Sequence, residues 1–172
     1  MQSLVLPALV TLTHTAAASP TYQVPLLGML SCPALTTLTT DPPGVRLCAP
    51  AHFPALTKLR VLTPARRLPH YLSQYSQQHD DTAADAPLVR AAPCLATLTL
   101  LWTGPGSLGH MLRHVTRMTP GACAPALCRV RLQVDRASAY GQTKLVEAAC
   151  RTAAGAFAAC GRHVKFEVVP RV

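Results

Sequence analysis

The chain has 172 residues, enough for one domain with a sizeable hydrophobic core. Hydrophobic residues make up 49% and charged residues 13%, which excludes a chain that is disordered throughout, and an aromatic content of 5% argues against a surface that stacks nucleic-acid bases. The net charge of +9 belongs mainly to the second half, because residues 86–172 hold eleven Lys/Arg and three Asp/Glu, whereas residues 1–85 hold five and four.

The first 40 residues contain no Lys, Arg, Asp or Glu, which raises the question of a targeting or membrane segment. A signal peptide needs a positively charged start, which is missing here, although Ala16, Ala17 and Ala18 imitate a cleavage site. Prolines at positions 7, 20, 25 and 33 interrupt every apolar run that could reach the length of a membrane span. We therefore expect this stretch to be part of the fold, without membrane association, and keep a targeting segment as the alternative.

A pattern of Pro-x-Leu-x-x-Leu-x recurs along the chain. It is clearest within residues 53–61 and recurs, with only Leu-to-Val drift, at residues 7–13, 33–39, 93–99 and 125–131. The prolines are 26, 21, 39 and 32 residues apart, so the first two intervals fit leucine-rich repeats and the last two need insertions. After the second leucine the apolar residues alternate, which predicts strands with one buried and one exposed face.

Residues 32–38 read Cys-Pro-Ala-Leu-Thr-Thr-Leu and, with their four relatives, resemble the Cys-Pro-x-Leu-x-x-Leu-x-Leu signature of ribonuclease-inhibitor-like leucine-rich repeats, the type found behind F-box domains. The pattern is degenerate, since His14 and Thr40 stand where the third apolar residue belongs. The resemblance implies an α/β solenoid with a parallel curved sheet on one side and helices and loops on the other. Residues 1–172 are then a single domain of about five repeats and a closing strand. No F-box-like segment precedes the repeats, and a fragment of a longer protein is one explanation.

The later elements depart from a plain repeat. Residues 64–87 interrupt the pattern and are expected to be an insertion or a worn-out repeat. A strand is expected over 98–102, a helix over 107–118 and a closing strand over 164–168. The strongest helix signal covers residues 144–159, with Thr143 as N-cap and Gly161 as the residue that ends it. The predicted buried side of this helix consists of Leu145, Ala149, Ala153, Ala156, Phe157 and Cys160.

Seven cysteines, an odd number without regular spacing, argue against a secreted disulfide framework. Most are expected to be buried thiols in a reducing, intracellular compartment, cytoplasmic or nuclear. Those expected to be buried are Cys32, Cys94, Cys128, Cys150 and Cys160. No pair forms Cys-x-x-Cys, so we expect no structural zinc.

Gly104, Gly106 and Gly109 fit the G-x-G-x-x-G pattern of a dinucleotide-binding loop, between a predicted strand and a predicted helix. However, no Asp or Glu lies between positions 85 and 135, so the acidic residue that would hold the ribose is missing. A small nucleotide-binding α/β enzyme fragment that uses this loop is the alternative function. The first hypothesis needs no cofactor and no catalysis.

His110 and His114 lie four residues apart on the predicted helix and could share a metal ion. A hydrolytic zinc helix would carry Glu directly after the first His, whereas Met111 stands there and Arg113 adds a positive charge. We expect a solvated helix flank and no metal.

The exposed residues of the predicted strands form the one charged pattern that follows the repeat. The candidate partner-binding residues are Lys58, Arg60, Thr97, Thr99, Arg129, Arg131 and Lys165. Arg60 and Arg131 are expected to lie two strands apart, about 10 Å, where their repulsion is weak, so the cations can persist without acidic partners.

Repeat proteins bind partners on such a face, so the first hypothesis is a non-catalytic scaffold for a protein partner, acidic in character, with nucleic acid less expected. The competing interpretation is a plain solvated surface in which Thr serves strand propensity and Arg serves solubility. A third hypothesis, a degenerate Ala- and Pro-rich reading frame, also stays open at this point.

Overall fold

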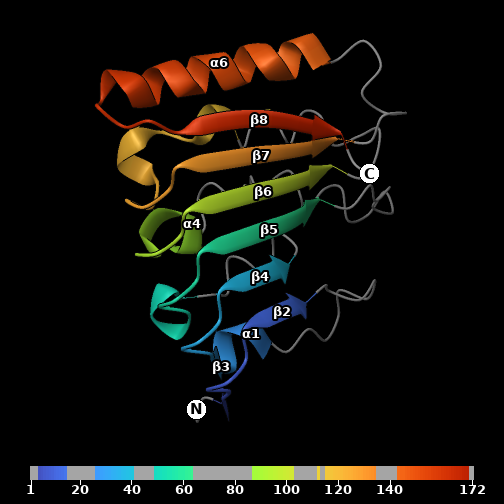
Figure 1. Ribbon diagram of the computed structural model, residues 1–172, viewed down its shortest axis with the longest axis vertical. Coiled ribbons are helices and arrows are strands. Elements are labelled where there is room, and N and C mark those ends of the chain that lie inside the picture. The colour runs from blue at the N-terminus through green and yellow to red at the C-terminus, as the bar shows by residue number, and fades with distance from the viewer. Residues whose placement is uncertain are drawn as a thin grey trace, which may run out of the picture.

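The computed structural model describes residues 4–14, 26–40, 49–63, 87–102, 112, 115–134 and 143–170. Within them the chain is α/β, built on a six-stranded parallel sheet in the order β2-β4-β5-β6-β7-β8 (Figure 1). The strands are β2 (Thr11–His14), β4 (Thr37–Thr40), β5 (Lys58–Thr63), β6 (Thr97–Trp102), β7 (Arg129–Val134) and β8 (Lys165–Pro170). A second, two-stranded parallel sheet pairs β1 (Leu4–Val5) with β3 (Leu30–Ser31). Within the main sheet the strands lie side by side in the order in which they occur along the chain, so the order never reverses.

The recurring proline sits in a tight turn rather than directly at the start of a strand. In the second repeat the backbone N–H of Leu35 donates to the carbonyl of Cys32 at 3.1 Å, so Pro33 occupies the second position of a four-residue turn. That position favours proline, because the ring already holds φ near the value the turn requires. The same hydrogen bond recurs from Leu9 to Leu6, Leu56 to Phe53, Leu95 to Ala92 and Leu127 to Ala124, at 3.1–3.4 Å.

One face of the sheet forms the hydrophobic core. Leu59 and Leu98 are Cα partners in neighbouring strands and both are 0% exposed, which confirms the prediction that they are equivalent and buried. The same row continues with Leu38 and Val130, and Phe166 packs against its end. A second buried row follows two residues later with Val61, Leu100 and Leu132.

His14 and Thr40 interrupt that second row at its N-terminal end. They are Cα partners, and Thr40 is also the partner of Val61, so both stand where the later strands place aliphatic residues. Thr40 is 0% exposed. Among the described residues, neither the Thr40 hydroxyl nor Nδ1 of His14 has a hydrogen-bond partner. The core therefore begins with a polar defect that the later repeats lack.

Short helical turns precede several strands: α1 (Leu26–Met29), η2 (Pro50–His52), α4 (Pro87–Ala91) and η4 (Pro120–Ala122). In Figure 1, α4 lies beside the N-terminal ends of β5 and β6. Of the helix predicted over 107–118, residues 112 and 115–117 are described and helical, with Val115 buried and Leu112 packed against the core.

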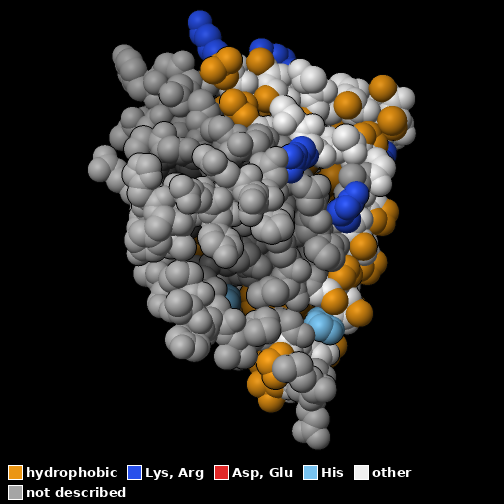
Figure 2. Space-filling model, turned by 180° about the vertical axis from the view of Figure 1, so that it is seen from behind, with side chains coloured by type: hydrophobic (Ala, Val, Ile, Leu, Met, Phe, Trp, Pro, Cys, Tyr) orange, Lys and Arg blue, Asp and Glu red, His pale blue; other side chains and the backbone are white. Residues whose placement is uncertain are grey.

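Seen from behind, the described surface carries mainly hydrophobic and uncharged side chains with a few Lys and Arg (Figure 2).

The long helix α6 (Thr143–Ala159) lies beyond β8, the last strand of the sheet, and runs across that edge (Figure 1). It buries Val146, Cys150, Ala153 and Phe157, whose spacing of four, three and four follows one helical face. The prediction was wrong for Leu145, Ala156 and Cys160, which are exposed. The prediction is confirmed for Ala153 and for Phe157, whose ring centroid lies 5.9 Å from that of Phe166, whereas Val146 and Cys150 are buried in place of their predicted neighbours, because an Ala-rich helix has little to mark its inner side.

Gly161 ends α6 as predicted. Its φ of 72° lies in the left-handed region, where a side chain would be strained. Its N–H donates to the carbonyl of Ala158 at 2.9 Å, and the N–H of Arg162 donates to that of Phe157 at 3.0 Å, which is the Schellman pattern. Thr143, predicted as the N-cap, is the first residue of the helix rather than the residue before it.

Arg162, directly after this turn, ties α6 to the segment before β7. Its guanidinium donates to the carbonyls of Pro120 at 2.5 Å, Ala124 at 2.6 Å and Cys123 at 3.2 Å. It also lies over the ring of Phe157, 5.2 Å from the centroid. A planar cation with several donors suits this role, because it can satisfy carbonyls that diverge from one turn.

The cysteines are less uniformly buried than expected. Cys32 and Cys150 are buried, as is Cys123. Cys94, Cys128 and Cys160 are exposed, which corrects the prediction for these three. The reason is local. Cys94 occupies the third position of its turn, Cys128 directly precedes β7, and Cys160 lies at the end of α6. The described cysteines are all free thiols.

Candidate partner-binding face

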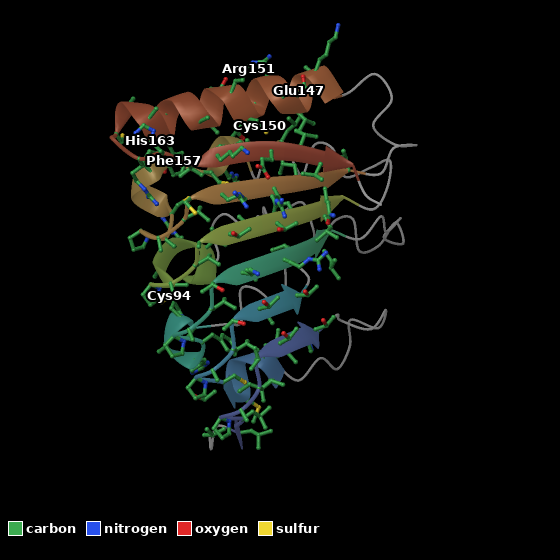
Figure 3. The ribbon with its side chains drawn as sticks, in the orientation of Figure 1. Cys94, Glu147, Cys150, Arg151, Phe157 and His163 are labelled. Atoms are coloured by element: carbon green, nitrogen blue, oxygen red, sulfur yellow. The ribbon has the colours of Figure 1, made fainter. Side chains whose placement is uncertain are left out.

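The predicted binding residues come together on the face of the sheet opposite the core. Alternation along each strand and the parallel register arrange them in two rows across β5 to β8. Along the first row the successive Cα partners are Lys58, Thr97, Arg129 and Lys165, and along the second they are Arg60, Thr99, Arg131 and Glu167. These eight residues are called the strand face below. Figure 3 shows their part of the sheet, with nitrogen- and oxygen-bearing side chains along β5 to β8.

Three cations of the strand face are exposed and could contact a partner. Lys58, Arg60 and Arg129 are exposed, and in the described part of the chain none of them forms an ion pair. β6 is the one strand between β5 and β7, so the predicted separation of Arg60 and Arg131 by two strands is confirmed. At about 10 Å in water, two unit charges repel by only about 0.4 kcal/mol, so the sheet tolerates this arrangement.

Glu167 pairs with the other two cations. Its carboxylate accepts from Nζ of Lys165 at 2.6 Å and from Nε of Arg131 at 3.0 Å. These hydrogen bonds lower the pKa of Glu167 to about 2, and the bond from Lys165 has the larger effect. The prediction that all the cations are unpaired was therefore wrong for Arg131 and Lys165. The register of β8 explains this, because it makes Glu167 the Cα partner of Arg131 and leaves Lys165 two residues away on the same face.

The two threonines are less accessible than predicted. Thr97 is half-buried and Thr99 is buried, although both lie on the outer face. Thr99 has Arg60 and Arg131 as its Cα partners on either side, and a short side chain between two long ones is shielded from solvent. Contacts to a partner would therefore come mainly from the cations.

A third row on the same face was missed by the sequence analysis. It consists of Leu62, Leu101, Gln133 and Val169, each four residues after a member of the first row. Leu101 is buried, and Oε1 of Gln133 is buried without a hydrogen-bond partner among the described residues. The alternation already contained this signal, since Leu62 and Leu101 share the phase of Lys58 and Thr97. The exposed polar surface is thus limited to the first two rows of these strands.

The thiols offer little reactivity where they are buried. Burial, with a smaller contribution from the nearby Glu147 and against the opposing effect of Arg151, raises the pKa of Cys150 to about 11 (Figure 3). Burial also raises the pKa of Cys123, although Arg162 partly opposes this. A thiol with a raised pKa is a poor nucleophile at neutral pH, because the thiolate is the reactive form.

The remaining candidate sites lie mostly outside the described residues. This holds for the loop containing Gly104, Gly106 and Gly109, for His110 and His114, and for residues 64–86 of the insertion predicted at 64–87. In the parts of the chain that the structure describes, no group of three or more His, Cys, Asp or Glu could hold a metal ion. Over the same residues, no helix has the length and apolar character needed to cross a membrane.

No protein-family model matches the chain, and comparison with curated proteins and with solved structures gives no match either. Its function is therefore inferred from its own geometry.

Proposed function

We propose that the protein is a non-catalytic scaffold of the ribonuclease-inhibitor-like leucine-rich-repeat type, which binds an acidic protein segment on its strand face. The observation that carries the proposal is the set of three exposed cations, Lys58, Arg60 and Arg129, held on neighbouring strands without acidic partners among the described residues.

The solenoid part of the proposal is supported by a contact that repeats from strand to strand. The N–H of Thr36 donates to the carbonyl of Val10, the equivalent residue one repeat earlier, at 2.9 Å. Thr57, Ala96 and Cys128 each make the same bond to the preceding repeat at 3.0 Å. Neighbouring repeats are therefore related by nearly the same translation, as expected when similar units stack in one direction.

The acidic character of the partner follows from the charge on the strand face. Five cations and one carboxylate share the two rows, and the carboxylate is already bound by Arg131 and Lys165. An acidic segment lying across β5 to β7 would meet Lys58, Arg60 and Arg129. Because the sheet holds the backbone of these residues in place, binding mainly costs side-chain ordering, and the positive potential would increase the association rate.

The alternative nucleotide-binding enzyme is not favoured by the strand order. Doubly wound nucleotide-binding sheets place the ligand where the strand order reverses, at a crevice outside the carboxyl ends of the strands. The described main sheet has no such reversal. Nucleic acid is also less favoured as a partner, because the strand face contains no aromatic side chain on which a base could stack.

The test uses two charge-reversal variants of equal net charge. The first changes Lys58, Arg60 and Arg129 to Glu. The control changes Arg90, Lys144 and Arg151 to Glu, which are also exposed but lie on helices. Arg131 is left intact, because its reversal would place a carboxylate beside Glu167.

A fluorescent polyglutamate peptide serves as the probe, with affinity measured by anisotropy at several salt concentrations. We expect the strand-face variant to bind at least about tenfold more weakly than the control, which should stay within about threefold of wild type. Equal losses in both variants would show that only net charge matters, and absence of wild-type binding at low salt would overturn the proposal. Tighter binding of a single-stranded RNA of the same charge would instead favour nucleic acid as the partner.

A further inference from the structure

The N-terminal edge of the sheet differs from every other repeat in what it exposes. Leu35, Leu56 and Leu95 are 0% exposed, whereas Leu9, in the same position of the first repeat, is only partly buried. Leu12 is likewise only partly buried, although Leu38, its Cα partner on the next strand, is 0% exposed. The cause is that, among the described residues, no strand lies on the outer side of β2.

Large apolar side chains gather at this edge. Leu4, Val5 and Val10 are 58%, 56% and 52% exposed. In the later repeats the position of Val10 is held by Thr36, Thr57, Ala96 and Cys128, none of which is a large aliphatic residue. Within the part of the chain that the structure describes, β1 and β2 therefore combine an unpaired strand edge with an apolar border. We call Leu4, Val5, Val10 and the strand β2 the N-terminal edge.

The opposite end of the sheet is treated differently. There α6 packs against β8 and crosses beyond it, as Figure 1 shows. Natural sheets commonly protect their edges with a helix, with charged side chains or with proline, because a free edge can pair with another strand. Strand β2 reads Thr-Leu-Thr-His and has neither charge nor proline within it.

Charge indicates which partner fits. The protein carries a net charge of +9, so two copies repel each other over most of their surface, but residues 1–40 contain no Lys, Arg, Asp or Glu. The nearest cations of the strand face, Lys58 and Arg60, lie on β5, two strands from β2, or about 10 Å. If two copies met at β2, these cations would be about 25 Å apart across the junction, well beyond the screening length of about 8 Å.

The sequence of β2 also permits pairing with itself. An antiparallel pair with its two-fold axis at Leu12 places Leu12 opposite Leu12 and Thr11 opposite Thr13. Residues opposite each other in an antiparallel pair share a face, so the two cores would join on one side and the two polar faces on the other. Such an isologous contact closes on itself and stops at two copies.

We propose that the N-terminal edge is a self-association site, through which two copies of the chain pair β2 with β2 in antiparallel fashion. In this register Val10 of one copy lies opposite His14 of the other, and both strand faces stay free. It does not depend on the proposed scaffold function, because it uses none of the cations of the strand face.

Sedimentation velocity on the full chain tests the proposal, since the monomer mass is 18.3 kDa and the dimer has twice that mass. The disruptive variant carries Thr11→Lys and Thr13→Lys, which lie opposite each other in the proposed pair and so set like charges against each other across the junction. Both side chains are already exposed, so the fold should tolerate the change. The matched control carries Thr152→Lys and Ala156→Lys, which add the same two charges at exposed positions of α6, at the other end of the sheet.

Between about 1 and 100 µM in physiological salt, we expect wild type and the control to show the same monomer–dimer equilibrium. The disruptive variant should dissociate at least about tenfold more readily, with an unchanged circular dichroism spectrum. The wild-type dimer should not weaken at high salt, because its contact is uncharged. A monomeric wild type at 100 µM, species larger than a dimer, or equal dissociation of both variants would overturn the proposal.

Discussion

Replacing Thr40 by Val should stabilise the protein. Thr40 is 0% exposed, its hydroxyl finds no hydrogen-bond partner among the described residues, and its Cα partner on β5 is Val61. Valine has nearly the same shape as threonine but carries no hydroxyl. A buried polar group without a partner costs about 1–3 kcal/mol, so Thr40→Val should raise the free energy of unfolding by about that amount. For a chain of this size the corresponding rise in Tm is roughly 2–12 °C.

Urea unfolding followed by circular dichroism measures the effect, and the slope against denaturant should stay the same, because the two proteins bury the same surface. Thr39→Val is the matched control, since Thr39 lies on the same strand but faces the outer side. It should change the free energy of unfolding by less than about 0.5 kcal/mol. If Thr40→Val destabilises the protein instead, the hydroxyl has a partner, and the interpretation of this position as a polar defect is wrong.

Two further perturbations follow from the described contacts. Arg162→Lys should destabilise the protein by about 1.5–3 kcal/mol in urea unfolding, because lysine cannot reach several diverging carbonyls at once. The control Arg151→Lys, on the exposed side of α6, should be nearly neutral. Equal effects of the two substitutions would contradict the role of Arg162. The pKa of Glu167 is lowered to about 2, so its stabilising contribution should be complete above about pH 4.5 and fall as the pH drops toward 2. The Tm difference between wild type and Glu167→Gln should therefore shrink over that range, and a constant difference would show that the pairing with Arg131 and Lys165 contributes nothing.

The strands and their inner face could be predicted because a short rule determines them. A proline that favours a turn, followed by leucines three residues apart and then by alternation, sets the start of a strand and its buried side together. This is why Leu59 and Leu98 were correctly placed as equivalent core residues. Strands β1 and β3 were not predicted, because two residues each are too short to show a period.

The features that depend on contacts between elements could not be read from the sequence. The pairing of Glu167 with Arg131 requires the register of β8, and β8 lacks the proline turn that marks the earlier strands. The buried side of α6 depends on its contact with Phe166, because alanines occur on several sides of the helix. The interactions of Arg162 require the carbonyls of Pro120 and Ala124 to turn toward it, which no local pattern signals.

The order of the strands has a consequence for how the molecule opens. Each strand of the main sheet pairs only with the strands before and after it in the chain, so separating β2 costs one set of neighbours whereas separating β6 costs two. Local unfolding is then expected to begin at an end and proceed inward, strand by strand. Helix α6 and Arg162 fasten the C-terminal end, and the polar pair of His14 and Thr40 weakens the N-terminal one. Opening should therefore have a direction, from the uncharged first repeat toward the cationic last ones.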